Sequence, residues 1–188
     1  MPTVPKTSAP DIVKAARRLI ARDGAAAFSL QEVAKAVGVQ APSLYKHFQD
    51  RAAVVRAVAA EVGRELAAAQ LAAAMAQGTL EARLGAAARA QREYARKKPH
   101  LYALVFDPST EELAPPDAAS RAQLQGLFDL LAQWMGGRNQ VLEGARLLTA
   151  FTHGFSMMER ARAFQLGGSV DQAFEFGLQR VLTALKGP

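Results

Sequence analysis

Apolar residues recur every three or four positions along most of this chain, and that spacing restricts the folds open to it. A period of 3.6 residues places such residues on one face of an α-helix, whereas a half-buried strand needs strict alternation. We find no convincing alternating segment, and β-branched runs are scarce beside alanine, leucine, arginine, glutamine and glutamate. The sequence therefore predicts an all-α fold of about nine helices.

The composition argues against several classes of protein. The 188 residues include no cysteine, which excludes disulfides, thiolate metal sites and cysteine nucleophiles. There is no 18-residue apolar run, and Pro2, Pro5 and Pro10 oppose a signal peptide, so we expect a cytoplasmic protein without membrane contact. The three histidines are scattered, and the sequence contains no nucleotide-binding or hydrolase motif. We therefore expect no metal site, no cofactor and no catalysis.

Glycine and proline divide the chain into the expected helices. They lie near residues 11–22, 30–37, from 40 or 41 to 48, 51–76, 79–97, 99–106, 117–135, 139–166 and 170–185. The longest loop is expected over residues 107–116, which include three prolines.

Residues 29–48 predict a helix, a tight turn and a second, short helix. Ser29 and Glu32 have the spacing of a capping box at the start of the first helix. Gly38 is typical of a helix end, and Pro42 is tolerated only in the first turn of the next helix. This order is the layout of a helix-turn-helix, in which the second helix enters a major groove.

The side chains of the second helix suit a DNA duplex. Ala41 and Pro42 are small enough to let its first turn approach base edges. The groups that can hydrogen-bond bases are Gln40, Ser43 and Lys46. The groups that can reach phosphates are Tyr45, His47 and Arg51. Residues 1–51 also hold eight bases against four acids, which favours an anionic partner.

Residues 12–51 resemble the DNA-binding domain of the TetR family of transcriptional regulators. The matching segments include Phe28-Ser29, Val37-Gly38-Val39 and Leu44-Tyr45-Lys46-His47-Phe48, followed by Asp50-Arg51. The resemblance implies that Tyr45, His47 and Arg51 contact the DNA backbone, with Ser29 at the amino end of the first motif helix. Gln40 departs from the family pattern, because a serine-type cap is common there and glutamine caps a helix less well.

The resemblance also implies an organisation in two domains. We expect a helix-turn-helix DNA-binding domain over residues 1–51, with a flexible arm over 1–9, and an effector-binding and dimerisation domain over 52–188. Such proteins are homodimers that bind a pseudo-palindromic operator and usually repress transcription. We therefore expect a ligand-responsive repressor that a small hydrophobic effector releases from DNA.

The carboxy-terminal region has a shorter similarity to the family. Phe151-Thr152-His153-Gly154-Phe155 resembles an aromatic-x-His-Gly core found in one subgroup of its ligand domains, and Gly154 permits close helix approach. The candidate lining of an apolar effector pocket is Tyr102, Phe106, Trp134, Phe151, His153 and Phe155. The last two long helices form a four-helix bundle between protomers in the family, and the candidate interface residues are Phe155, Met158, Phe174, Leu178, Val181 and Leu185.

Two alternatives stay open at this point. The same apolar residues suit core packing or an interface, and we rank both ahead of a pocket lining. A helical dimer that binds another protein through a repurposed helix-turn-helix also fits the pattern. Retention on heparin or nonspecific DNA, with elution by salt, distinguishes a DNA-binding protein from this second alternative.

Overall fold

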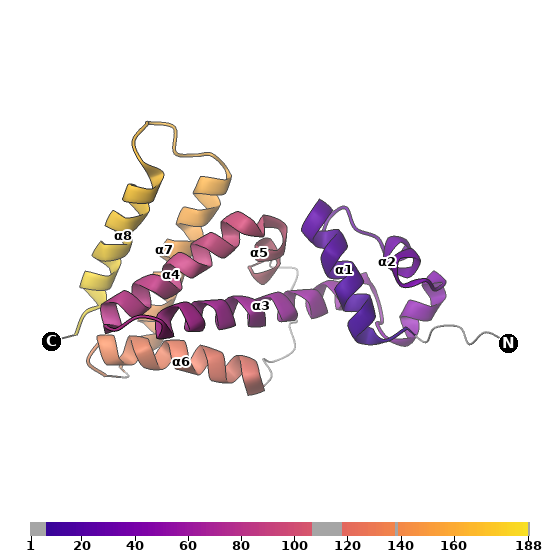
Figure 1. The fold of residues 1–188 in the computed structure, drawn as a ribbon, viewed down its shortest axis with the longest axis horizontal. Coiled ribbons are helices and arrows are strands. Elements are labelled where there is room, and N and C mark those ends of the chain that lie inside the picture. Colours follow the sequence, from indigo (N-terminus) through magenta and orange to yellow (C-terminus); the bar gives the residue numbers. More distant parts are fainter. Residues whose placement is uncertain (1–6, 107–117, 138, 188) are drawn as a thin grey trace. The chain divides into compact units, whose positions relative to one another are not determined.

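The computed structural model describes residues 7–106, 118–137 and 139–187, and this part of the chain folds into helices joined by turns (Figure 1). The helices are α1 (Ala9–Asp23), α2 (Leu30–Val37), the 3₁₀ helix η1 (Ala41–Lys46), α3 (Arg51–Met75), α4 (Leu80–Lys97), α5 (Pro99–Val105), α6 (Ala118–Trp134), α7 (Val141–Arg160) and α8 (Val170–Leu185). The predicted all-α fold is confirmed. The predicted loop over 107–116 and residues 1–6 of the predicted arm lie outside the described residues.

The helices belong to two compact units. The first unit combines Met1–Gly63 with Lys98–Pro116, so it contains α1, α2, η1, α5 and the first half of α3. The second unit combines Arg64–Lys97 with Asp117–Pro188, and it contains the rest of α3 with α4, α6, α7 and α8. Within the described ranges, no helix is both long and apolar enough to cross a membrane.

In the first unit, α1 begins two residues before its expected start because Ser8 caps it. The Ser8 hydroxyl accepts a hydrogen bond from the Asp11 amide at 3.3 Å, and the Asp11 carboxylate accepts one from the Ser8 amide at 3.2 Å. This reciprocal capping box satisfies two amides that the first turn would leave unpaired. The inward face of α1 then buries Ile12 and Ile20 against α2 and α5.

The second unit has a core to which α4, α6, α7 and α8 contribute. Leu84, Leu131 and Phe174 are buried in it. The Phe151 ring of α7 packs directly on Gly177 of α8, where an added Cβ would lie 2.5 Å from a ring carbon. A larger residue at position 177 would therefore displace the Phe151 ring.

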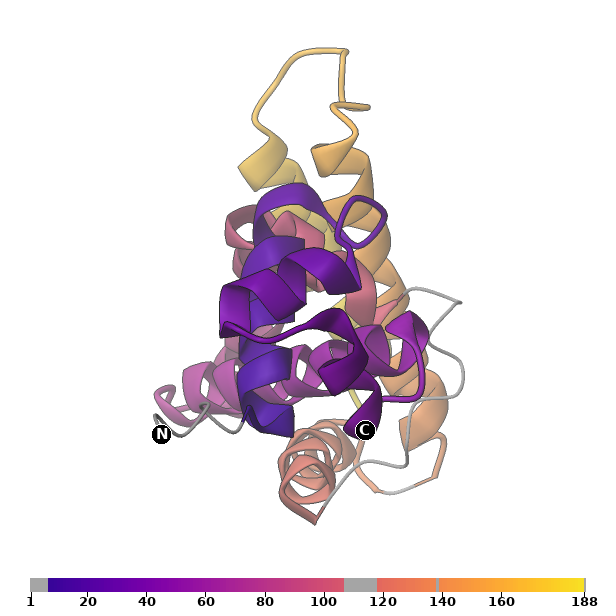
Figure 2. The same cartoon turned by 90° about the vertical axis from the view of Figure 1, so that its right-hand side faces the viewer.

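The structure corrects the expected helix over 139–166, because α7 ends at Arg160. Arg162 adopts a left-handed φ of 53°, and the Ala163 amide donates to the Met158 carbonyl at 2.9 Å. That bond, from the second residue past the C-cap Ala161, is the Schellman type of termination, which stops an α-helix. The turn over 161–169 joins α7 to α8 and extends beyond the ends of both helices (Figures 1 and 2).

Candidate nucleic-acid interface

The first helix of the motif, α2, begins and ends where its sequence predicts. The Ser29 hydroxyl accepts from the Glu32 amide at 3.3 Å, and the Glu32 carboxylate accepts from the Ser29 amide at 3.0 Å. Gly38 takes a left-handed φ of 73°, which lets the Val39 amide reach the Ala34 carbonyl at 3.0 Å. Both ends of α2 are therefore fixed by local hydrogen bonds, and the chain enters η1 in a defined direction.

The second helix of the motif is a six-residue 3₁₀ helix instead of an α-helix. Its bonds span three residues: the Ser43 amide donates to the Gln40 carbonyl and the His47 amide to the Leu44 carbonyl, both at 2.9 Å. The Gln40 side chain makes no capping hydrogen bond, in line with the expected weak cap, and Pro42 has no amide to donate. Short 3₁₀ segments are common as connectors between α-helices.

One side chain attaches η1 to the first unit. Leu44 is 1% exposed, and among the six residues of η1 it alone is buried. The remaining candidates at the start of the motif are partly or fully exposed. Gln40 and Pro42 are exposed, whereas Ala41 and Ser43 are half-buried. The structure thus places the predicted base-reading positions on the surface of the first unit.

The end of η1 presents three polar side chains to solvent. Tyr45 is 57% exposed, and Lys46 and His47 are exposed beside it. A tyrosine exposed in this way offers both its ring and its hydroxyl to a partner. A phenol, an ammonium and an imidazole in sequence can donate hydrogen bonds to phosphate oxygens.

Arg51, the last predicted phosphate contact, is occupied by its own unit. Its Nε donates to the Phe28 carbonyl at 3.2 Å, and a second guanidinium nitrogen donates to the Ala25 carbonyl. The guanidinium also lies 4.8 Å from the centre of the Phe28 ring. Arg51 therefore positions the loop before α2, a role that the sequence alone did not reveal because its partners lie more than 20 residues away.

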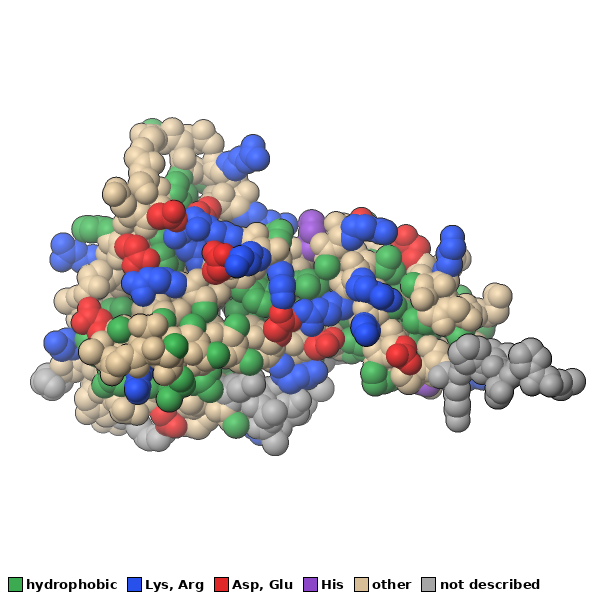
Figure 3. Space-filling view, viewed as in Figure 1, with side chains coloured by type: hydrophobic (Ala, Val, Ile, Leu, Met, Phe, Trp, Pro, Cys, Tyr) green, Lys and Arg blue, Asp and Glu red, His purple; other side chains and the backbone are tan. Residues whose placement is uncertain are grey.

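The first unit has a basic surface around this motif. Lys14, Arg18, Lys35 and Lys46 are exposed, and Figure 3 shows Lys and Arg side chains gathered over α1. The acids nearest the motif in sequence are occupied as helix caps: Glu32 caps α2, and the Asp50 carboxylate accepts from the Ala53 amide at 2.7 Å. Residues 7–51 hold seven lysines and arginines against four acids, and this excess of positive charge favours a polyanion.

The predicted pocket residues do not form one cluster within either unit. Tyr102 and Phe106 belong to the first unit, where Tyr102 is 1% exposed and its ring lies 5.2 Å from that of Phe106. Trp134 belongs to the second unit and donates from Nε1 to the Leu182 carbonyl at 2.8 Å, so it joins α6 to α8.

The aromatic-x-His-Gly segment lies on α7 and faces two directions. Phe151 and Phe155 pack on the ring of Phe174, with centroids 5.6 and 5.2 Å away. His153 is half-buried, and burial lowers the pKa of its imidazole. A Cβ added at Gly154 would meet no atom within 4 Å, so Gly154 makes no close contact with another helix in the described part of the chain.

The predicted interface residues differ in exposure. Phe174 and Leu178 are 0% and 1% exposed in the core of the second unit, so they offer no surface to a second copy. Phe155, Val181 and Leu185 are half-buried, and Met158 is 49% exposed. The structure adds apolar surface that we did not predict, at Leu147 (47%) and Phe176 (64%).

A cleft of about 490 Å³ lies where the turn after α6 meets the end of α8. Its lining comes from Met135–Gly137, Asn139–Gln140, Glu143–Gly144, Leu147 and Ala184–Gly187. This lining includes none of the six predicted pocket residues. It is also largely polar, which does not match the apolar effector that we expected.

A short helix anchored by one leucine, presented behind a capped helix, defines the first unit as a helix-turn-helix unit of an all-helical regulator. Comparison with known families agrees with this class. Residues 12–58 match the model of bacterial regulatory proteins of the tetR family, and residues 84–181 match the model of the tetracyclin repressor-like C-terminal domain. The chain belongs to the TetR family, whose members are DNA-binding transcriptional regulators.

Solved structures show the same fold over nearly the whole chain. A protein of unknown function from Rhodococcus sp. RHA1 is 22% identical, with a TM-score of 0.73, and the alignment covers 99% of this chain and 100% of that protein. A TetR family transcription regulator from Marinobacter aquaeolei VT8 is 17% identical (TM-score 0.68, 96% of each chain). BioQ of Mycobacterium smegmatis is 21% identical, with a TM-score of 0.66, and the alignment covers 95% of this chain and 98% of BioQ. Among curated proteins, none matches the chain.

Proposed function

We propose that this chain is a homodimeric repressor that binds a pseudo-palindromic operator through η1 and is released by a small-molecule effector. The observation that carries the proposal is the exposed row Tyr45, Lys46 and His47 at the end of a helix held by Leu44. Gln40 and Ser43 face base edges, while the three residues of the row contact phosphates. Residues 1–51 act as the DNA-binding domain, and residues 52–188 bind the effector and dimerise.

The salt dependence of DNA binding tests this proposal. Duplexes selected from a random pool are titrated with the protein at several salt concentrations, and the same is done for Lys46→Ala. Each phosphate contact adds about 0.9 to the slope of log affinity against log salt, so Lys46→Ala is expected to lower that slope by about one.

Lys97→Ala is the matched control for this titration. Lys97 is equally a surface lysine, 71% exposed and paired with Glu93, but it lies on α4. Its loss is expected to leave the slope unchanged. A wild-type protein that binds no duplex at low salt would contradict the proposal, as would a Lys46→Ala slope equal to that of Lys97→Ala.

The surface of α7 supports the homodimer. Leu147, Ala150, Gly154 and Met158 recur at spacings of three or four and are exposed or half-exposed. Because nothing within the described chain packs on Gly154, a helix of a second copy can approach α7 there. This stripe of small and apolar residues resembles a helix–helix interface more closely than a solvated surface.

Sedimentation equilibrium measures the dimer directly. We expect twice the chain mass of 20.1 kDa for the wild type. We expect a shift toward the monomer for Gly154→Leu, since a bulky side chain would separate the two copies. Ala163→Leu, in the exposed turn after α7, is the control and is expected to stay dimeric. A wild-type monomer at micromolar concentration would contradict this part of the proposal.

The long helix α3 gives the effector a route to the DNA-binding unit. Arg51–Met75 is continuous and contributes to both units, so a shift of α3 changes the position of η1 in each protomer. Two recognition helices need a separation of about 34–36 Å to enter successive major grooves. An effector that binds the non-matching geometry more tightly therefore releases the operator.

A further inference from the structure

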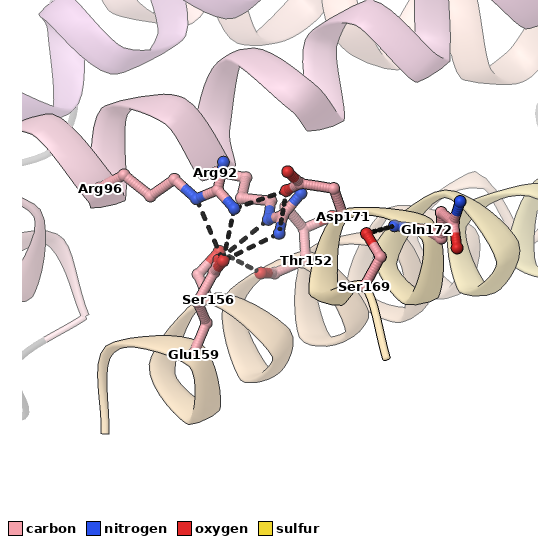
Figure 4. A network of polar contacts seen from close by, with 8 residues as sticks. All are labelled: Arg92, Arg96, Thr152, Ser156, Glu159, Ser169, Asp171 and Gln172. Atoms are coloured by element: carbon pink, nitrogen blue, oxygen red, sulfur yellow. Dashed lines mark hydrogen bonds and ion pairs between the residues drawn. The ribbon is translucent and has the colours of Figure 1, made fainter. Parts of the chain in front are cut away.

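Two arginines of α4 converge on carboxylates from α7 and α8 in the second unit (Figure 4). Arg92 makes two parallel bonds of 2.9 Å to Glu159 and a third of 2.8 Å to Asp171. Arg96 contacts the same two acids at 2.5 and 2.6 Å. Planar guanidinium groups bind carboxylates in this way, with a defined direction as well as charge.

Arg92 lies against an aromatic wall. Its side chain is 7% exposed, and its guanidinium carbon is 4.4 Å from the centre of the Phe174 ring and 5.3 Å from that of Phe155. The ring of Phe164, from the turn after α7, lies 4.7 Å from Phe155. The charged end of this site is therefore bordered by apolar surface, where cation–π contacts hold the guanidinium.

The two acids are held unequally. The Glu159 side chain is 18% exposed and receives hydrogen bonds on both of its oxygens. The Asp171 side chain is 67% exposed, and both of its arginine contacts end on the single oxygen Oδ1. Asp171 lies in the first turn of α8, so its side chain can rotate away while the backbone bonds of the helix stay intact.

The turn beside Asp171 leaves room for the Asp171 side chain to rotate away from the arginines. Residues 161–169 are all exposed, and Gly167 and Gly168 both adopt a φ of 81°. A segment with few buried contacts opens at low free-energy cost. Solvent therefore reaches the Asp171 carboxylate, whereas Glu159 stays enclosed between the two arginines.

We infer that Arg92 and Arg96 form a binding site for the carboxylate of an amphipathic small molecule, and that Asp171 occupies this site until the ligand carboxylate replaces it. The apolar part of the ligand packs on Phe155 and Phe164. Asp171 competes as a tethered carboxylate, so a bare anion is a poor ligand and the apolar contact supplies the difference. The carboxylate site itself does not depend on the proposed function; only the identification of its ligand with the effector of a repressor rests on that proposal.

Calorimetric titration of the full chain, without DNA, tests this site. The probes are benzoate and octanoate, with benzamide as the uncharged analogue. We expect both carboxylates to bind and benzamide not to bind. Asp171→Asn removes the competing charge at constant shape, so it is expected to tighten carboxylate binding at least tenfold. Arg96→Gln is expected to weaken it at least tenfold.

Glu175→Gln is the matched control for Asp171→Asn. Glu175 also lies on α8 and pairs with an arginine of α4, Arg89, at 2.6 Å, but within the described residues it forms no hydrogen bond or ion pair with Arg92 or Arg96. The affinity of the Glu175→Gln variant for benzoate is expected to stay within twofold of that of the wild type. An equal gain in Glu175→Gln would reveal a net-charge effect and overturn the site.

The remaining outcomes also decide the question. Absence of heat for both carboxylates with Asp171→Asn overturns the site, and so does benzamide binding as tightly as benzoate. Should Arg96→Gln unfold, Arg96→Lys keeps the charge but loses the planar fork, and unchanged affinity in that variant counts against the site. Because no DNA is present, a failure here is distinct from a failure to bind an operator.

Discussion

Replacing Leu44 with alanine is expected to cost the first unit about 2–5 kcal/mol of unfolding free energy, the usual range for a buried leucine. The effect on DNA binding is expected to be a near-complete loss. Leu44 is the one buried residue among the six of η1, so its removal leaves that helix without an apolar anchor. Urea unfolding followed by circular dichroism, together with titration of a selected duplex, measures both effects.

Tyr45→Ala is the control for Leu44→Ala. Tyr45 is the adjacent residue but is 57% exposed, so its truncation is expected to change the unfolding free energy by less than about 0.5 kcal/mol. DNA affinity is still expected to fall, because the phenol is lost from the binding surface. If Leu44→Ala unfolded at the same urea concentration as the wild type, η1 would not depend on this anchor.

Replacing Arg92 with alanine is expected to destabilise the second unit by about 3 kcal/mol. Glu159 would then be a largely buried carboxylate with one guanidinium fewer to pair with its charge. The Phe174 ring would also lose its cation–π contact. Arg89→Ala removes an exposed pair, 52% and 46% exposed at its two side chains, and is expected to cost about 0–1 kcal/mol. Thermal unfolding of the two variants side by side makes the comparison, and equal costs would contradict it.

The same network predicts how stability depends on pH. Hydrogen bonding from Arg96 lowers the pKa of Asp171. Burial acts to raise the pKa of Glu159, but the hydrogen bonds from Arg96 and Arg92 outweigh it, so this pKa is also lowered. A carboxyl whose pKa is lower in the folded state stabilises the fold above its unfolded pKa of about 4, and that contribution disappears as the pH falls through the folded pKa. The difference between wild type and Arg92→Ala is therefore expected to shrink below about pH 4.

Local patterns predicted the helix-turn-helix well, because the forces involved act over a few residues. The capping box of Ser29 and Glu32, the left-handed Gly38 and the start of η1 next to Pro42 all depend on neighbours within four positions. The 3₁₀ form of η1 was not predicted, since hydrophobic spacing over six residues does not separate it from an α-helix.

These local patterns could not predict contacts between helices that are distant in the sequence. Phe174 and Leu178 have the helical spacing of an interface, yet they fill the core of their own chain. The Phe151 ring packs on Gly177, whereas a Cβ added at Gly154 would meet no described atom within 4 Å. The pairing of Arg92 with Glu159 spans 67 residues, and no local spacing indicates it. The assignment to the aromatic-x-His-Gly subgroup stays a prediction.

Hydrogen–deuterium exchange with and without a selected duplex tests most directly whether the polar side of η1 binds DNA. Peptides that cover residues 40–48 are expected to exchange more slowly when the duplex is added, and a duplex of unrelated sequence at high salt is expected to have no such effect. Unchanged exchange over residues 40–48, with protection confined to other parts of the chain, would contradict the assignment of η1 as the DNA-binding element.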